Sequence, residues 1–384
     1  MRRVLVILIV IGIGLLAVVF LARREEKASN LSAQVISTSI PIEGFARADG
    51  THSLSFPADF GPHHDYQTEW WYYTGNLDTA EGRHFGYELT FFRVAMQPPD
   101  QAALRASEWA ADQIYMAHFA ITDVEGGEFH AFQRFARGAI DLAGAEVQPY
   151  RVWLEDWNVE QTGSNSYLLT ASNEGLWITL NLIDEKGPVL QGEAGYSRKG
   201  SDPSSASYYY SQSRLLTLGE IGIGDEIFAV TGLSWKDHEF STNVLEPNQV
   251  GWDWFSIQLD DNYEIMLYQI RHEDGSIDPF SSGALIMPDG TTQPLASGDY
   301  EIETHDTWRS PYSDAVYPMG WTIRIIGAGL ELDLAPYLLD QELNLSTIYW
   351  EGAVRVTGQH NGNPVGGVGY VEMTGYAEPL SPGL

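Results

Sequence analysis

The residues best suited to chemistry lie in one short run, Trp235-Lys236-Asp237-His238-Glu239. Three adjacent ionisable side chains beside a tryptophan are costly to hold inside a strand unless they serve a purpose. Alternation along a strand places Trp235, Asp237 and Glu239 on one face, with Lys236 and His238 on the other. An Asp that is desolvated among apolar groups keeps its proton near neutral pH, so Asp237 is the expected proton donor of an acid–base site.

Aromatic residues gather around further charged groups in a second run, Glu69-Trp70-Trp71-Tyr72-Tyr73. Glu69 shares a strand face there with Trp71 and Tyr73, and an aromatic wall of this kind suits a large apolar molecule. The structural alternative is that these rings are core packing and that Glu69 pairs with Arg93 or Arg83.

Two downstream residues complete the predicted substrate wall. Trp254 lies in Gly251-Trp252-Asp253-Trp254-Phe255, where it shares a face with Trp252, and the hydroxyl of Tyr268 can reach the same cavity. Trp235, Trp254, Tyr268, Trp71, Tyr73 and Glu69 are therefore the expected substrate-binding residues.

The remaining histidines favour structural interpretations. His63-His64-Asp65 falls in a Gly-Pro loop and is expected to be solvated, whereas His118 in an apolar strand is expected to be a hydrogen-bonded core residue. His63, His64, Asp65 and Glu239 are of metal-ligating types, but no ligand spacing supports a metal site, and none is predicted.

Composition excludes several classes of function. The 384 residues contain no cysteine, which rules out disulfides, zinc–thiolate sites and thiol nucleophiles. No Gly-x-Ser-x-Gly elbow occurs, so a serine-hydrolase mechanism has no basis in the sequence. The formal net charge of −31 disfavours nucleic acid as a partner.

Short segments rich in aromatic and β-branched residues, bounded by Gly, Asp, Asn or Pro, predict an all-β fold. Asp-Gly at 274–275 and 289–290 and Glu-Gly at 81–82 predict hairpin turns, and helices are expected only at Pro98–Asp112 and Ala335–Glu342. The expected strands are Trp70–Leu77, Phe85–Arg93, Tyr115–Thr122, Tyr150–Trp157, Ser166–Ala171, Leu176–Leu182, Trp254–Leu259, Glu264–Arg271, Trp321–Ile326 and Gly366–Met373.

The N-terminus predicts a membrane segment. An uncharged apolar run over residues 4–22 follows Met1-Arg2-Arg3 and is long enough to cross a bilayer as a helix. We expect an uncleaved signal anchor over residues 1–27, with the body on the periplasmic or extracellular side; the alternative is a signal peptide whose cleavage releases a secreted body. Residues 28–47 read as a tether, and the polar connector after Ser241 divides the body into domains 48–242 and 243–384.

Motifs across nearly the whole body resemble the AttH / carotenoid 1,2-hydratase (hydroxyneurosporene synthase) family. The segments that carry the resemblance are Thr68–Asn76, Phe85–Arg93, Ala117–Ala120, Trp235–Glu239, Gly251–Leu259, Met266–Tyr268, Tyr349–Val354 and Gly366–Tyr376. The resemblance implies two tandem lipocalin-like antiparallel β-barrels. It also implies a hydratase-like lyase that adds water to a double bond of an isoprenoid or a similar hydrophobic small molecule.

Such a reaction protonates carbon to give a tertiary cation, which water then captures. Trp and Tyr faces stabilise the cation, and a histidine or a carboxylate helps to deliver the water. Asp237, His238 and Glu239 are the expected catalytic residues, and the scheme needs no cofactor.

Two other functions fit the same aromatic lining. One is a non-catalytic periplasmic carrier of a lipid that works with an export system, in which case Asp237-His238-Glu239 is a polar lock between the domains. The other is a cyclase-like or isomerase function in which the pocket shapes a polyene and adds no water.

Overall fold

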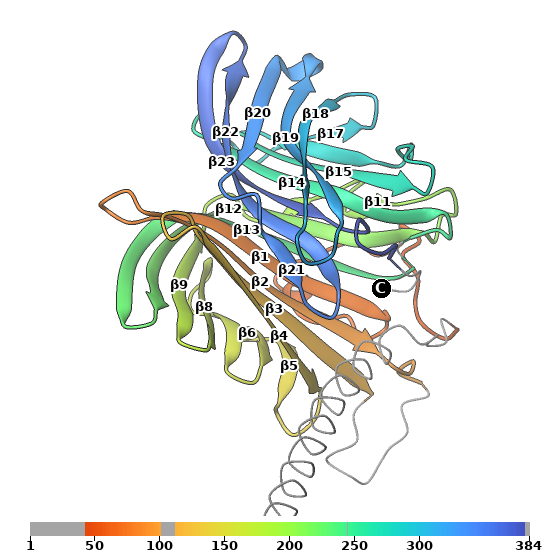
Figure 1. The fold of residues 1–384 in the computed structure, drawn as a ribbon. Coiled ribbons are helices and arrows are strands. Elements are labelled where there is room, and N and C mark those ends of the chain that lie inside the picture. The colour runs from red at the N-terminus through yellow and green to blue at the C-terminus, as the bar shows by residue number, and fades with distance from the viewer. Residues whose placement is uncertain (1–42, 101–111, 244, 381–384) are drawn as a thin grey trace, which may run out of the picture. The chain divides into compact units, whose positions relative to one another are not determined.

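The computed structural model describes residues 43–100, 112–243 and 245–380. Within these residues the chain is almost entirely antiparallel β-sheet, which confirms the predicted all-β class, and its helical elements are two 3-10 turns, η1 (Ala58–Phe60) and η2 (Ile326–Ala328). The strands form two sheets, A and B (Figure 1).

Sheet A contains the first thirteen strands of the described chain, and β13 lies at its centre between β1 and β12. The strands are β1 (Thr68–Asp78), β2 (His84–Ala95), β3 (Gln113–Asp123), β4 (Glu128–Arg137), β5 (Ala143–Val147), β6 (Tyr150–Leu154), β7 (Trp157–Gln161), β8 (Ser166–Asn173), β9 (Leu176–Asp184), β10 (Val189–Leu190), β11 (Tyr196–Arg198), β12 (Ala206–Ile223) and β13 (Glu226–Asn243).

Sheet B contains the other ten described strands, and β14 pairs with both β15 and β23. The strands are β14 (Gln249–Leu259), β15 (Glu264–His272), β16 (Ser282–Ile286), β17 (Thr292–Ala296), β18 (Glu301–Arg309), β19 (Val316–Ile325), β20 (Leu330–Pro336), β21 (Glu342–Asn344), β22 (Ile348–His360) and β23 (Asn363–Met373).

Each sheet curls around an apolar core of its own. In sheet A the core joins strands from both ends of the strand order, and the ring of Phe119 on β3 lies 5.6 Å from that of Trp157 on β7. In sheet B the core is centred on Phe255, Trp321 and Trp350. The alternation of apolar side chains along each strand fills these cores, and it leaves the opposite face of the strand for other contacts.

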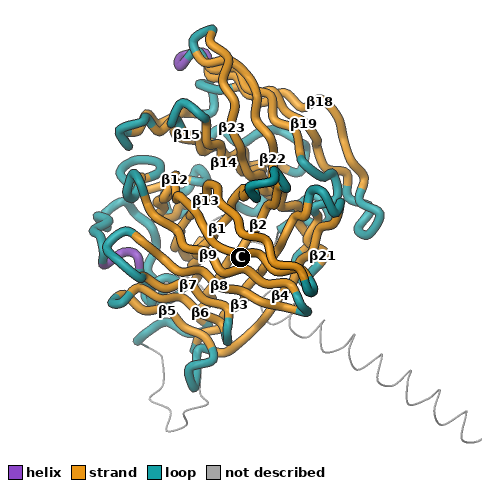
Figure 2. Tube along the Cα trace, turned by 90° about the vertical axis from the view of Figure 1, so that its left-hand side faces the viewer, coloured by secondary structure: helices purple, strands orange, loops and turns teal. Residues whose placement is uncertain are grey.

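The outer faces of the two sheets pack against each other along β1, β2, β22 and β23. Tyr72 donates to Glu351 at 2.9 Å, and the amide of Asn76 donates to the carbonyl of Gly369 at 3.0 Å. Close approach requires a glycine at Gly86, where a Cβ would lie 2.6 Å from that of Ala353. Figure 2 shows the same strands from the side.

A buried ion triad also joins the sheets. Glu264 of sheet B accepts from Arg214 on β12 at 2.5 Å and from Lys186, in the loop after β9, at 2.8 Å. A buried carboxylate is held stably only when such partners satisfy it, so the triad fixes this edge of the packing.

Several local predictions are confirmed and others are wrong. Gly82, Gly275 and Gly290 have φ between 81° and 91°, the left-handed conformation that the predicted turns require. The expected strand Tyr150–Trp157 is instead the hairpin of β6 and β7. The expected helix Ala335–Glu342 is wrong, because β20 continues to Pro336 and β21 begins at Glu342.

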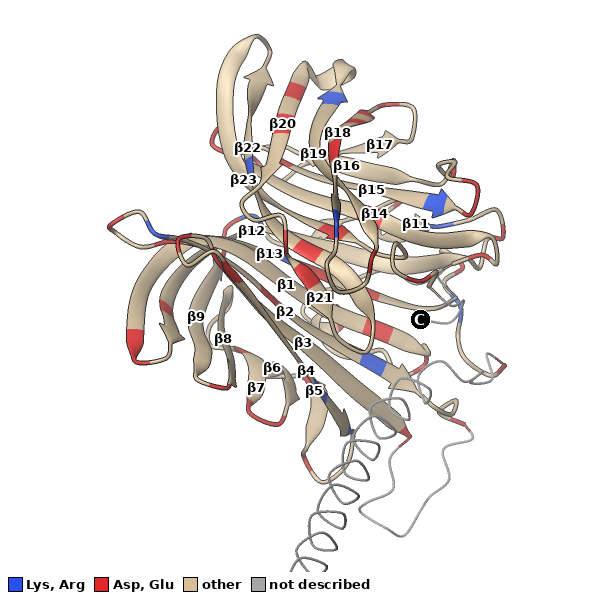
Figure 3. Ribbon diagram, viewed as in Figure 1, with Lys and Arg blue, Asp and Glu red and all other residues tan. Residues whose placement is uncertain are grey.

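The predicted anchor (1–27) and most of the predicted helix Pro98–Asp112 lie outside the described residues, as does most of the tether (28–47). Among the residues that are described, none forms a helix long and apolar enough to span a membrane. Sheet A ends with β13 at Asn243 and sheet B begins with β14 at Gln249. Asp and Glu side chains greatly outnumber Lys and Arg on both sheets (Figure 3).

Candidate functional site

The central strand β13 divides the predicted site residues between its two faces. Its register with β1 is regular, so alternation holds as predicted: Asp237 pairs with Tyr72 and His238 with Trp71. Trp235 and Asp237 lie between the sheets, whereas His238 lies in the interior of sheet A.

The predicted set therefore does not form one site. The structure brings Trp235, Asp237, Glu239, Trp254 and Tyr268 together between the sheets, in a region that we call the inter-sheet site. It places His238, Glu69, Trp71 and Tyr73 on the other face of sheet A, inside its core.

Asp237 is buried at the centre of the inter-sheet site. Its carboxyl accepts from the hydroxyls of Tyr209 and Ser211, both at 2.5 Å, and from the indole of Trp235 at 2.7 Å. Burial raises the pKa of Asp237 to about 7, even though these three donors lower it. The indole of Trp254 donates to the hydroxyl of Tyr209 at 3.1 Å, which connects the group to sheet B.

Three glutamates, one each from β2, β22 and β23, add to this region. Glu372 pairs with Trp254 on one side and with Glu351 on the other, so these residues form one row across sheet B. Burial raises the pKa of Glu88 to about 7 and that of Glu372 to about 8, and it raises the pKa of Glu351 well above its ordinary value. The charges of Glu88, Asp237 and Glu239 contribute to the rise at Glu372.

The inter-sheet site retains unsatisfied polar atoms and an accessible edge. Within the described chain, the hydroxyl of Tyr370 and one oxygen of Glu351 are buried without a hydrogen-bond partner. Trp70, Trp252 and Glu372 keep partial exposure although their neighbours in the strands are buried. Buried polar atoms without partners commonly mark the place of a ligand or of water.

Glu239 and Tyr268 meet through a lysine that sequence reasoning did not single out. The Nζ atom of Lys199 lies 3.3 Å from a carboxylate oxygen of Glu239 and 4.0 Å from the centre of the Tyr268 ring. Although burial opposes it, the charge of Glu239 raises the pKa of Lys199. The hydroxyl of Tyr268 is already occupied by Ser282, at 2.8 Å, and by the carbonyl of Arg198, at 3.2 Å.

Inside sheet A, Glu69 forms the ion pair with Arg93 that the sequence offered as its structural role, at 2.9 Å. It also accepts from His238 and from His63, each at 2.8 Å. Burial opposes ionisation, yet Arg93 and the two histidines hold the pKa of Glu69 well below its ordinary value. Trp71 stacks on the ring of His238.

The expectation for His63 is wrong, and that for His118 is confirmed. His63 is largely buried, because its loop folds back over the end of sheet A and places the imidazole between Glu69 and Asp59. His118 is a buried core residue that hydrogen-bonds to the hydroxyl of Tyr349. Burial lowers the pKa of His118 to about 3, so its ring is neutral.

His63, Glu69 and His238 bring their donor atoms within 4.8 Å of one another, as do His52, Asp59 and His63. The nitrogen–oxygen separations of 2.8–3.0 Å in these groups are those of hydrogen bonds, and they are shorter than the spacing of two ligands around a tetrahedral zinc ion. Arg93 already neutralises Glu69, so a divalent cation would have to compete with a buried guanidinium.

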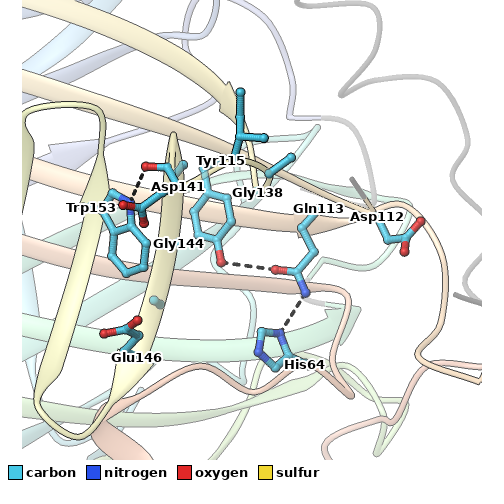
Figure 4. A pocket seen from close by; sticks show the side chains of 13 residues that line it. His64, Asp112, Gln113, Tyr115, Gly138, Asp141, Gly144, Glu146 and Trp153 are labelled. Carbon is cyan, nitrogen blue, oxygen red and sulfur yellow. Dashed lines mark hydrogen bonds between the residues drawn. The ribbon is translucent and has the colours of Figure 1, made fainter. Parts of the chain in front are cut away.

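A surface pocket of about 440 Å³ lies at one end of sheet A, lined in part by His64, Gln113, Tyr115 and Trp153 (Figure 4). The amide of Gln113 bridges the ring of His64, at 2.8 Å, and the hydroxyl of Tyr115, at 3.1 Å. None of the predicted site residues lines this pocket.

Sequence reasoning missed the roles of Glu88, Glu351 and Glu372. Each is a single glutamate flanked by apolar residues within a strand, at Tyr87-Glu88-Leu89, Trp350-Glu351-Gly352 and Val371-Glu372-Met373. A lone charge in an otherwise apolar strand is the pattern that points to such positions. The hairpin of β22 and β23 makes Glu351 and Glu372 neighbours, and the packing of sheet A on sheet B brings Glu88 to them.

The raised pKa of Asp237 predicts a pH-dependent stability. The folded state holds this proton to about pH 7 and the unfolded state releases it near 3.8, so the stabilisation from the bound proton is lost as pH rises. As pH rises from about 5 to about 8, the wild type is therefore expected to lose about 2 to 3 kcal/mol of unfolding free energy relative to the Asp237→Asn variant, which has no titrating group at this position. Urea unfolding at several pH values measures this, and parallel pH profiles would contradict it.

Two barrel-like antiparallel sheets, each with its own core, define a tandem lipocalin-like protein with a carboxyl-rich and aromatic-rich region between the sheets. A family profile described as AttH-like matches residues 47–376, and the chain belongs to this family. The crystal structure of an AttH from Nitrosomonas europaea is 37% identical, with a TM-score of 0.76 over 86% of this chain and all of that one.

The chain is similar to kievitone hydratase in sequence over part of its length and in fold. The sequence from Fusarium solani subsp. phaseoli is 26% identical over 144 residues, which is 36% of this chain and 40% of that protein. The crystal structure from Nectria haematococca shares the fold, with a TM-score of 0.64 and 16% identity over 87% of this chain and 96% of that one.

Proposed function

We propose that the chain is a hydratase-like lyase that adds water to a carbon–carbon double bond of an apolar substrate, an isoprenoid or a similar molecule, in the inter-sheet site. The observation that carries the proposal is the cluster of buried carboxyl groups beside Trp and Tyr faces, where burial raises their pKa values. The family and its similarity to kievitone hydratase support the same chemistry.

Glu372 suits the role of proton donor. Its pKa of about 8 keeps it protonated at neutral pH, and it lies in register beside Trp254 at the accessible edge. Transfer of its proton to the alkene leaves a carbocation that the faces of Trp254 and Trp235 can stabilise.

Asp237 suits the role of base in this scheme. The sequence predicts it as the donor, but three hydrogen-bond donors converge on its two oxygens, which is the pattern that stabilises a carboxylate. Water adds to the cation through its oxygen and gives its extra proton to Asp237. The product is an alcohol, and proton return from Asp237 to Glu372 completes the cycle.

One observation favours the carrier function instead. Asp237, Tyr209 and Trp254 form a hydrogen-bonded link between the sheets, as a polar lock would. A carrier needs the same aromatic lining and leaves its ligand unchanged.

Incubation of the full chain with kievitone, and separately with an acyclic carotenoid, in ¹⁸O-water tests the proposal by mass spectrometry. A product heavier by one labelled water supports the lyase. If both probes return unlabelled, and organic extracts of the purified wild type and of Asp237→Asn contain the same unaltered lipid, the carrier function replaces it.

A further inference from the structure

A continuous chain of hydrogen-bonded side chains runs through sheet A, on the face of β13 opposite the inter-sheet site. It begins at His52, whose side chain is 36% exposed, and passes to Asp59 at 3.0 Å and from there to His63 at 2.8 Å. His63 bonds to Glu69 and Glu69 to His238, each at 2.8 Å.

The inner end of the chain is a lysine. His238 Nδ1 lies 2.9 Å from the hydroxyl of Tyr210, which in turn accepts from the Nζ atom of Lys236 at 3.1 Å. This is the hydrogen bond that the ammonium of Lys236 makes in the described structure, and five aromatic rings surround the group. The rings belong to Phe60, Tyr73, Tyr150, Tyr167 and Tyr210, with centroids 4.7–5.9 Å from Nζ.

The direction of each hydrogen bond follows from the groups. Glu69 is ionised and only accepts, so His238 Nε2 carries a hydrogen toward it. Burial lowers the pKa of His238 to about 4, so its ring is neutral and its Nδ1 accepts from the hydroxyl of Tyr210. Lys236, Tyr210 and His238 therefore all donate toward Glu69, which is the alignment that proton transfer along the chain requires.

The outer half presents a second donor to Glu69, from the solvent side. His63 lies between two carboxylates and donates from both ring nitrogens. Although burial lowers it, the hydrogen bonds to Asp59 and Glu69 raise the pKa of His63. Burial likewise opposes ionisation of Asp59, yet His63, the backbone of Ser55 and His52 lower its pKa to about 2.

Lys236 is the group that needs a hydrogen-bonded path to solvent. Burial lowers its pKa to about 7, against the attraction of Asp184 and Asp237. An amine that is half protonated near neutral pH can give or take a proton readily, but burial among rings would isolate it from water unless a path existed.

We propose that this hydrogen-bonded chain, which begins at His52 and ends at Lys236, is a proton relay. It makes Lys236 a general acid–base group inside sheet A, separate from the inter-sheet site. A proton leaves Lys236 for the Tyr210 oxygen as the Tyr210 hydrogen moves to His238 and the Nε2 hydrogen moves to Glu69. The net result is a neutral amine and a protonated Glu69. His63 releases its Nε2 hydrogen to solvent through Asp59 and His52, and after its ring turns over it accepts the Glu69 proton at the freed nitrogen.

The relay can be tested on the full chain by NMR with ¹⁵N-labelled lysine, because the sequence contains only four lysines: Lys27, Lys186, Lys199 and Lys236. The resonance absent from Lys236→Met identifies Lys236. The measured quantity is the rate at which its amine protons exchange with water near neutral pH.

Tyr210→Phe removes one hydroxyl that belongs to the relay, and Asp59→Asn blocks it near the surface with little change in shape. Both are expected to slow exchange by more than about tenfold, the factor that corresponds to roughly 1.4 kcal/mol of barrier. Tyr167→Phe is the matched control: it removes a hydroxyl that binds Gln212, from another ring around Lys236, and is expected to exchange as the wild type does.

Wild-type exchange in both Tyr210→Phe and Asp59→Asn would overturn the relay. Slow exchange in Tyr210→Phe alone would also overturn it, because protons would then leave by a route that avoids Asp59. Equal slowing in Tyr167→Phe would attribute the effect to looser packing and remove the basis of the proposal. Thermal unfolding of each variant checks that the fold is retained.

Discussion

Replacement of Glu372 by Gln is expected to lower the rate of water addition by about 10²- to 10⁴-fold, the usual contribution of a general acid. Gln keeps the size of the side chain and its place beside Trp254 but has no proton to give. Asp237→Asn is expected to reduce the rate by a similar factor, because the amide cannot accept the proton of the attacking water. Initial rates of product formation by mass spectrometry measure both effects.

Asp253→Asn is the control for this comparison. Asp253 is a buried carboxyl next to Trp254 in sequence, but its side chain leaves β14 on the opposite face, where Arg271 and Tyr376 contact it, each at 3.1 Å. Activity per folded molecule is expected to stay near the wild-type value. Wild-type rates in Glu372→Gln would contradict the assigned donor, even if water addition itself were observed.

The pH dependence of activity tests the role of Glu372 independently. Wild-type activity is expected to fall as pH rises through about 8, because Glu372 then loses the proton that it must donate. A rate that rises over this range would mean that the ionised form is the active one.

Replacement of Arg93 by Met is expected to cost about 3–5 kcal/mol of unfolding free energy, the range for removing one partner of a buried ion pair. Both partners are fully buried, and Arg93 also donates to the carbonyls of His63 and Tyr66, each at 2.9 Å. Its loss leaves Glu69 without its guanidinium partner and frees the loop that holds His63. Urea unfolding near neutral pH measures the change.

The matched control is Arg324→Met, which breaks ion pairs with Glu303 and Glu331 on the surface and is expected to change stability little. The double variant Glu69→Gln/Arg93→Met removes both charges and is expected to recover part of the loss. If Arg93→Met costs no more than Arg324→Met, the ion pair does not hold the end of sheet A together.

Much of the fold could be predicted from sequence, because strand alternation and turn residues are local. Gly275 and Gly290 mark hairpins through the conformations they permit, aromatic content locates β1, and apolar alternation fits β8. The wrong helix at Ala335–Glu342 arose because its run of apolar and acidic residues has helical composition, whereas the pairing of β20 with β19 and β22 decides its conformation.

The candidate site could be predicted only in part. Alternation correctly separates Asp237 from His238, but it cannot tell which face of a central strand meets the second sheet, since both faces of β13 are buried. Packing of the two sheets brings Glu351 on β22 to Tyr72 on β1, and His63 reaches Glu69 because a loop folds back. These contacts depend on the tertiary arrangement rather than on local pattern.

The regular register of β13 against β1 has a consequence for how this segment tolerates change. From Trp235 to Phe240, successive side chains point alternately into the inter-sheet site and into the core of sheet A. The effects of substitutions along this segment should therefore alternate between these two regions, residue by residue. A single-residue insertion would be worse than any substitution, because it would exchange the contents of the two environments. Lys236 would then face the buried carboxyl groups of the inter-sheet site, and Asp237 would face the five aromatic rings that now surround Lys236. Selection must therefore preserve the length of this segment as strictly as its composition.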